Sequence, residues 1–151
     1  MKIAIAVNGA CGRMGKRIVQ LAHEDPELQV AAALDAPSHP DQGKDVGELC
    51  GIGAIGVQVT PGLAVGQRID SVIDFSMPEG TMTVLPMCRD RQLPLVVATT
   101  GHTPLQRQEI EAAAHHTAVL LAPNMSLVVN VLFKLVRQAA EAPPPEAPDM
   151  F

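Results

Sequence analysis

A glycine-rich segment near the amino terminus constrains the fold of this chain more than any other feature. Three glycines occur in the run Gly-Ala-Cys-Gly-Arg-Met-Gly over residues 9–15. The run follows an apolar stretch, residues 3–7, typical of a buried parallel strand, and residues 13–23 continue it as an amphipathic helix. Glycines at such a junction allow a tight turn, a close approach of the backbone to a phosphate and close helix packing. The segment therefore predicts a dinucleotide-phosphate loop inside a βαβ unit.

Strands and helices are predicted to alternate along the rest of the chain. The expected strands are residues 28–34, 56–60, 71–75, 95–98 and 119–122, and the expected helices are residues 45–49, 78–91, 104–116 and 126–142. Alternation of this kind places the strands in parallel, with helices on both faces of the sheet. We therefore predict an α/β fold, a Rossmann-type doubly wound parallel sheet in a single domain.

Three local features refine this prediction. Pro86 is expected to kink or shorten its helix, and Thr103 is expected to cap the next one. The last helix is expected to turn one apolar face inward. That face consists of Leu127, Val128, Val131, Leu132 and Leu135. The domain is expected to span residues 1–141, and the Pro-rich residues 142–151 are expected to form a tail or linker.

Composition excludes several classes of function. The 151 residues suit one domain, and 47% are hydrophobic, which is enough for a core. The net charge of −5 argues against a nucleic-acid surface. No apolar stretch is long enough to cross a membrane. The three cysteines have no metal-site spacing, so we expect no metal, and they favour a reducing, cytoplasmic location.

Asp35 ends the second predicted strand, 20 residues after Gly15. An acid at this position accepts hydrogen bonds from the adenosine ribose in dinucleotide-binding folds. Its charge opposes a 2′-phosphate, which favours NADH over NADPH. Arg13 or His39 could still assist a phosphate, so NADPH binding stays possible. Cys11 lies at a helix N-terminus that could lower its pKa, although a small loop side chain is the simpler interpretation.

Polar segments follow three further strands. They are Asp-Phe-Ser with Pro-Glu-Gly over residues 74–80, Ala-Thr-Thr-Gly over residues 98–101, and Ala-Pro-Asn-Met-Ser over residues 122–126. Each alone is best explained as an ordinary turn with a helix cap. Because ligands bind at the carboxyl ends of strands in open α/β sheets, their joint occurrence indicates a binding edge.

Together these motifs are similar to those of the N-terminal domain of the 4-hydroxy-tetrahydrodipicolinate reductase family, of lysine and diaminopimelate biosynthesis. The resemblance covers roughly residues 1–140. It implies a nicotinamide-dependent reductase of a cyclic dicarboxylate. It also implies the following cofactor-binding residues: Gly9, Ala10, Cys11, Gly12, Arg13, Met14, Asp35, Phe75, Ala98, Thr99, Thr100, Ala122, Pro123, Asn124 and Met125.

The chain departs from the family pattern at several positions. Ala98 replaces the usual Gly, Met125 replaces Phe, and His102 also stands where Phe is common. Ala36 follows the ribose acid where the family often has an Arg for the 2′-phosphate, which again favours NADH. These exchanges bear on the nicotinamide pocket rather than on the diphosphate loop.

In the second domain of the family, a His-His-x-x-Lys segment supplies the proton and binds substrate, and a Gly-Thr pair holds a carboxylate. No His-His-x-x-Lys segment occurs in this sequence, and Gly80-Thr81 belongs to the Pro-Glu-Gly motif of the predicted cofactor domain instead. We therefore expect no catalytic residue in this chain and no substrate domain. The family is homo-oligomeric, and the domain that assembles it is expected to be missing here. Two alternatives remain: a nucleotide-binding module without catalysis, and the cofactor domain of another NAD(P)-dependent dehydrogenase.

Overall fold

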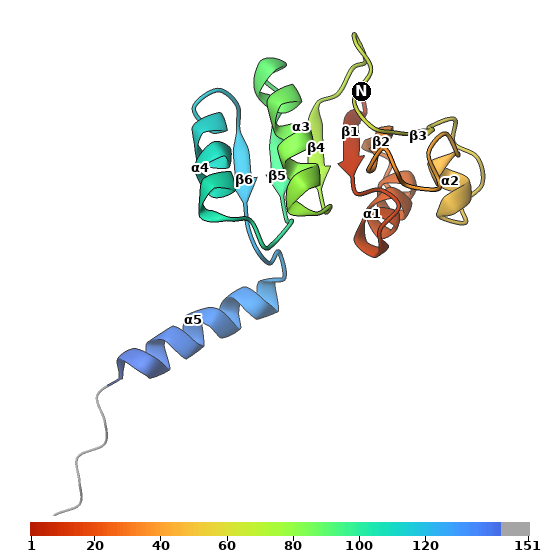
Figure 1. Ribbon diagram of the computed structural model, residues 1–151. Coiled ribbons are helices and arrows are strands. Elements are labelled where there is room, and N and C mark those ends of the chain that lie inside the picture. Colours follow the sequence, from red (N-terminus) through yellow and green to blue (C-terminus); the bar gives the residue numbers. More distant parts are fainter. Residues whose placement is uncertain (143–151) are drawn as a thin grey trace, which may run out of the picture.

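Alternating apolar strands and amphipathic helices build one sheet with helices on both sides (Figure 1). The computed structural model describes residues 1–142. The strands are β1 (Ile3–Asn8), β2 (Leu28–Leu34), β3 (Val59–Thr60), β4 (Ser71–Asp74), β5 (Leu95–Val97) and β6 (Val119–Leu121). The helices are α1 (Arg13–Glu24), α2 (Val46–Leu49), α3 (Pro78–Asp90), α4 (Pro104–Ala113) and α5 (Leu127–Glu141).

The six strands lie in the order β3-β2-β1-β4-β5-β6, and every neighbouring pair is parallel. The predicted Rossmann-type parallel sheet is therefore confirmed. The chain runs outward from β1 in one direction, then returns to place β4 on its other side. This reversal between β1 and β4 is the position at which such sheets bind ligands.

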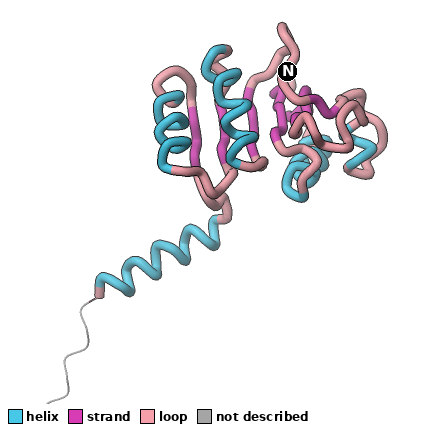
Figure 2. Tube along the Cα trace, viewed as in Figure 1, coloured by secondary structure: helices cyan, strands magenta, loops and turns pink. Residues whose placement is uncertain are grey.

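Two apolar clusters fill the two faces of the sheet. Residues of α1 and α2 pack against β1, β2 and β3 on one face, with Val7, Val19 and Val59 at the centre. Residues of α3 and α4 pack on the other face, where Leu95 and Ile110 are buried (Figure 2). The core is aliphatic throughout, as expected for a chain with 2% aromatic residues.

The helix signals in the sequence are largely confirmed. Thr103 caps α4 by accepting the backbone N–H of Gln106, whose side chain in turn accepts the N–H of Thr103. Pro86 does not end α3, which continues to Asp90. Proline has no backbone N–H, so Pro86 leaves one hydrogen bond of the helix unmade. Buried side chains on α3, including Leu85 and Cys88, nevertheless pack the helix against the sheet.

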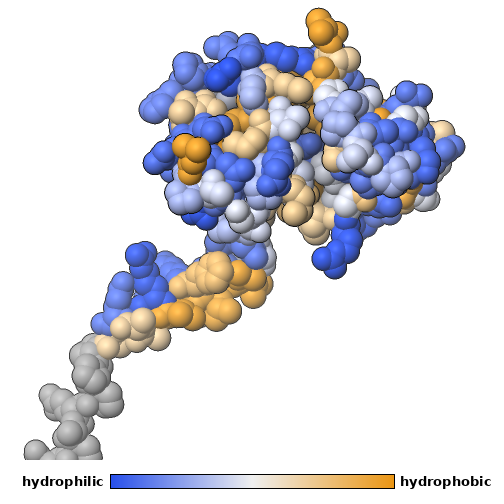
Figure 3. Space-filling view, viewed as in Figure 1, coloured by the Kyte–Doolittle hydropathy of each residue, from blue (hydrophilic) through white to orange (hydrophobic). Residues whose placement is uncertain are grey.

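The prediction that α5 turns an apolar face inward is wrong. None of residues 127–141 is buried, and the helix stands away from the sheet (Figure 1). Its apolar side chains form a continuous hydrophobic band in Figure 3. The exposed members are Leu127, Val128, Val131, Leu132, Phe133, Leu135 and Val136. The helical period was correct, but periodicity does not say which surface an apolar face meets.

The predicted Pro-rich tail lies outside the described residues from position 143 onward. Among the described residues, no helix is long and apolar enough to cross a membrane.

A matched pair of leucine substitutions distinguishes the packed body from α5. Leu95 is 1% exposed and Leu132 is 54% exposed. Leu95→Ala should lower the free energy of unfolding by about 2–5 kcal/mol, because it leaves a cavity in the core. Leu132→Ala should change it by less than about 0.5 kcal/mol. Urea denaturation of both variants measures the difference, and equal losses would contradict the exposed placement of α5.

Candidate functional site

A pocket of about 570 Å³ opens at the carboxyl ends of β1, β2 and β4, across the reversal in strand order. Four segments line it: the glycine loop, the turn after β2, the loop after β3, and the start of α3. The lining residues are Asn8, Gly9, Cys11, Gly12, Asp35, Ala36, Pro37, His39, Pro61, Phe75, Ser76, Met77, Glu79, Gly80 and Thr83. The pocket thus joins segments that are far apart in the sequence.

The glycine loop forms the pocket floor and leads directly into α1. The N–H groups of Gly9 and Ala10 both donate to the carbonyl of Leu34, which ties the loop to β2. Gly12 is the N-cap of α1, and no side chain caps the helix. The N–H groups of the first turn have no intrahelical acceptor, and the helix dipole adds positive potential there. This end of α1 therefore suits a diphosphate.

The three loop glycines are needed for different reasons. Gly9 has a φ of +77°, and a Cβ there would lie 2.6 Å from the carbonyl oxygen of Phe75. A Cβ on Gly15 would clash with the backbone of Gly9. Gly12 has an ordinary φ of −71°, and a Cβ there would meet only the Gly9 carbonyl, at 3.2 Å. Gly12 is therefore the loop glycine that the fold itself can replace most easily.

Asp35 lies at the pocket wall, in contact with the glycine loop. Its Oδ2 accepts the N–H of Cys11 at 2.9 Å, and its Oδ1 accepts the N–H of Ala36 at 2.9 Å. The side-chain amide of Gln42 donates to the Asp35 carbonyl at 2.9 Å. These contacts fix the carboxylate, while its remaining lone pairs can accept hydroxyl groups. Asp35 therefore offers acceptor oxygens to hydroxyl groups of a ligand in the pocket.

Cys11 is not an activated thiol. Burial, followed by the charge of Asp35 and a hydrogen bond to it, raises the pKa of Cys11 to about 12. These effects oppose the helix N-terminus, which was the reason to consider a lowered pKa. The thiol is therefore protonated at neutral pH and is no nucleophile in this state.

Asp74 is the centre of a buried hydrogen-bond network beside the pocket. Its carboxylate is 0% exposed. It accepts the side-chain amide of Asn8 at 2.9 Å and the Ser76 hydroxyl at 2.6 Å. It also accepts the hydroxyls of Thr81 and Thr99, at 2.5 and 3.1 Å. One carboxylate therefore connects the ends of β1, β4 and β5 with α3.

The segments after β5 and β6 lie at the same edge of the sheet but outside this pocket. Thr99 is buried, and its hydroxyl is used in the bond to Asp74. Asn124 is occupied locally: its Oδ1 accepts the Ser126 N–H, and its carbonyl accepts the Asn130 amide. Ala98, Thr100, Ala122, Pro123 and Met125 also do not line the pocket. Of the predicted residues, five line the pocket: Gly9, Cys11, Gly12, Asp35 and Phe75. Three further residues of the glycine loop, Ala10, Arg13 and Met14, do not line it, and the rest form an outer group after β5 and β6.

Sequence reasoning missed several residues of the site, among them Asn8 and Pro61. Asn8 is 6% exposed, and its amide donates to Asp74, Ser76 and the Gly80 carbonyl. A polar residue ending an apolar strand could have indicated this role. Pro61 reaches the pocket from the loop after β3. No sequence signal marks Pro61, because its place depends on pairing of β3 with β2.

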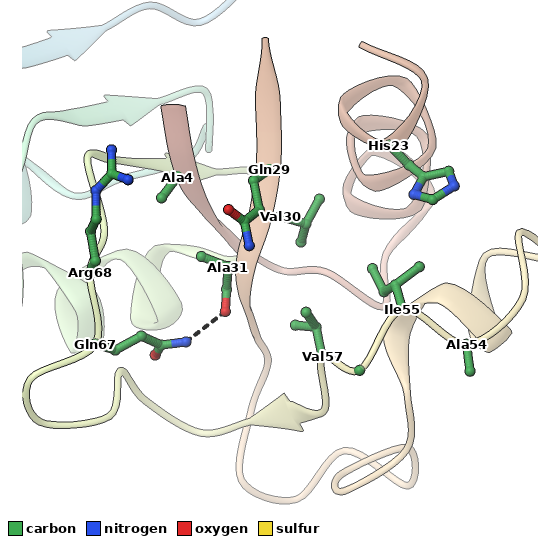
Figure 4. Close-up of a pocket in the computed structure, with 11 residues that line it drawn as sticks. Ala4, His23, Gln29, Val30, Ala31, Ala54, Ile55, Val57, Gln67 and Arg68 are labelled. Atoms are coloured by element: carbon green, nitrogen blue, oxygen red, sulfur yellow. Dashed lines mark hydrogen bonds between the residues drawn. The ribbon is translucent and has the colours of Figure 1, made fainter. Parts of the chain in front are cut away.

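A second cavity, of about 620 Å³, lies at the opposite end of the strands (Figure 4). Residues from the start of β1 and β2 line it, together with His23, Gln67 and Arg68. Gln67 donates to the Ala31 carbonyl at 2.6 Å across this cavity. Ligands of open α/β sheets bind at the carboxyl ends instead, so we assign the functional site to the glycine-loop pocket.

The strand order, the glycine turn into an uncapped helix and the acid at the end of β2 define a Rossmann-type domain of the dinucleotide-binding class. Residues 3–125 match the family model described as dihydrodipicolinate reductase, N-terminus. The chain belongs to this family.

Similar proteins agree with this assignment. Over 141 residues the chain is 42% identical to 4-hydroxy-tetrahydrodipicolinate reductase of Methylococcus capsulatus, covering 93% of this chain and 52% of that one. It is 41% identical to the protein of the same name from Halorhodospira halophila, covering 94% and 54%. The structure of dipicolinate-bound dihydrodipicolinate reductase from Paenisporosarcina sp. TG-14 has the same fold, with a TM-score of 0.70 and 23% identity. That alignment covers 93% of this chain and 54% of that one. The chain thus spans about half the length of these relatives.

Removing the Asp74 carboxylate should destabilise the whole edge of the sheet. Asp74→Ala leaves buried donors without a partner, and each unsatisfied group costs about 1–3 kcal/mol. We expect a loss of at least about 2 kcal/mol in the free energy of unfolding, measured by urea denaturation. Asp90→Ala is the control, because that side chain is 64% exposed and should change stability by less than about 0.5 kcal/mol. Equal effects of the two would refute the role of Asp74.

Proposed function

We propose that this chain binds NAD(P)H and serves as the cofactor domain of a reductase acting on a cyclic dicarboxylate in lysine and diaminopimelate biosynthesis. The observation that carries the proposal is the glycine loop with its uncapped helix, placed beside Asp35 in one pocket. The family membership and the names of the relatives support the reaction class.

The residues present fit a dinucleotide. The backbone of the loop over residues 9–14 would hold the diphosphate, because Gly12 leaves the helix end open. Asp35 would accept the adenosine ribose hydroxyls. Phe75 lies on the opposite pocket wall, after β4. The bound cofactor would supply the hydride, and the outer group of residues at the ends of β5 and β6 would lie toward its nicotinamide.

Replacement of Gly12 tests this binding mode. Gly12→Val adds a side chain where the diphosphate would approach, so the affinity for NADH should fall at least about tenfold, or about 1.4 kcal/mol. Stability without cofactor should change by less than about 2 kcal/mol, because the φ of Gly12 suits any residue. Calorimetric titration with NADH measures the affinity, and urea denaturation checks the fold.

Gly62→Ala is the control for this substitution, because Gly62 lies outside the pocket and its added Cβ meets only the flexible end of Met87. It should bind NADH as the original chain does. Undiminished NADH binding by Gly12→Val would refute the proposed binding mode, and no binding by the original chain at millimolar NADH would refute the proposed function.

Cofactor preference should depend on Asp35. The carboxylate opposes a 2′-phosphate, and the following residue is Ala36, which offers no positive charge. We expect NADH to bind about tenfold more tightly than NADPH, a difference of about 1.4 kcal/mol. Asp35→Ala should narrow this difference, whereas Asp90→Ala should leave it unchanged. Competitive titration with both cofactors measures the ratio, and tighter binding of NADPH by the original chain would contradict the preference.

This chain alone should not reduce substrate at a useful rate. Hydride transfer needs a positioned substrate and a proton source, and positioning alone contributes about 7–11 kcal/mol. His102 is 8% exposed and does not line the pocket. Lys134 and Arg137 lie on α5, away from the sheet. NADH oxidation should stay at background with substrate generated in situ, and a rate within about tenfold of a complete two-domain reductase would overturn this expectation.

A further inference from the structure

Three side chains with metal-binding atoms meet beside the glycine loop. Cys11 belongs to the loop itself, and His39 and Asp41 belong to the segment after β2. The sulfur, one imidazole nitrogen and one carboxylate oxygen all lie within 4.8 Å of one another. Each residue is partly buried. The cluster therefore combines one sulfur, one nitrogen and one oxygen donor from two separate segments.

Backbone contacts hold the second segment over the loop. The N–H of His39 donates to the Ala36 carbonyl at 2.8 Å. The side-chain amide of Gln42 donates to the carbonyls of Asp35 and Ala36, at 2.9 and 2.8 Å. The N–H of Gly43 donates to the Val59 carbonyl of β3 at 2.9 Å. The proximity of the three donors is thus a consequence of the folded turn.

Two carboxylates and two lysines surround the cluster. Lys44 donates to Oδ1 of Asp41 at 2.6 Å. The other carboxylate oxygen of Asp41, Oδ2, lies 3.8 Å from Nδ1 of His39. Asp35 adds a second carboxylate beside Cys11. Lys16 and Lys44 are the opposing positive charges near the cluster.

We propose that Cys11, His39 and Asp41 bind a divalent transition-metal cation of the Zn²⁺ class. Sulfur, imidazole and carboxylate donors are the ligands of Zn²⁺ sites, and three protein ligands with one water complete a tetrahedron. Mg²⁺ and Ca²⁺ prefer oxygen ligands alone, so they fit this donor set poorly. A coordinated thiol loses its proton to the medium as the metal–sulfur bond forms.

The metal site overlaps the cofactor pocket, because Cys11 and His39 both line it beside Asp35. A bound cation there excludes the ribose end of a dinucleotide. Metal and NADH should therefore compete. The expected competition between metal and NADH rests on the proposed function, NAD(P)H binding. Metal binding by itself does not depend on that function.

Cobalt(II) titration of the cofactor-free chain tests the site, because a cobalt–thiolate bond gives a charge-transfer absorption band that other ligands do not. We expect this band to saturate at one ion per chain and Zn²⁺ to abolish it, while Mg²⁺ and Ca²⁺ leave it unchanged. Cys11→Ser should remove the band. His39→Gln and Asp41→Asn should each weaken cobalt binding more than about tenfold. Loss of a residue that only hydrogen-bonds a metal ligand already costs about tenfold in metal affinity, and loss of a ligand itself should cost more.

Matched controls use the same residue types elsewhere. Cys50→Ala removes a free buried thiol, and His23→Gln removes an imidazole that lies outside the glycine-loop pocket. Both variants should keep the cobalt–thiolate absorption band. A band that survives Cys11→Ser, or none in the original chain, would overturn the proposal. If NADH binds by calorimetry and displaces cobalt, the overlap is supported; if NADH binds without displacing it, the overlap is refuted. A cobalt band without any NADH binding would support the metal site and refute the proposed function alone.

Discussion

The carboxylate of Asp74 accepts hydrogen bonds from three neighbouring parts of the functional edge of the sheet. Asn8 closes β1, Thr99 follows β5 and Thr81 lies in the first part of α3. A buried carboxylate is costly without such partners, and here each lone pair direction is used. The pocket therefore has a rigid wall at the reversal in strand order, and the turn after β4 has a fixed position against the glycine loop.

The glycine loop depends on this arrangement. Gly9 passes so close to the carbonyl of Phe75 that no Cβ fits between them. That contact exists only because β1 and β4 are neighbours, which in turn follows from the strand order. Gly12, by contrast, has an ordinary backbone conformation, and a Cβ there would contact only the Gly9 carbonyl, at 3.2 Å. The fold therefore requires Gly9 and Gly15 more strictly than Gly12.

Much of the fold could be predicted from local sequence. The apolar run of β2 and the Thr103 cap were predicted correctly, because both depend on neighbouring residues alone. The helix expected over residues 78–91 is close to the observed α3, which runs through Pro86 to Asp90. The apolar face of α5 misled, because a helical period predicts an amphipathic helix, but the surface that an apolar face contacts is a tertiary property. The Cys11 pKa was likewise set by burial and Asp35, which no local pattern reveals.

The sequence by itself determined the glycine turn, the alternation of strands and helices, and the acid at Asp35. These follow from residue-level preferences: a positive φ, apolar periodicity and a polar residue at a strand end. The tertiary structure alone decided which strand ends share one pocket, since that depends on the order β3-β2-β1-β4-β5-β6. It placed Asn8 in contact with Asp74 and His39 close to Cys11. It also placed the Thr99 hydroxyl in a buried hydrogen bond to Asp74. Contacts between distant residues are fixed by packing of whole elements, and no spacing within one segment encodes them.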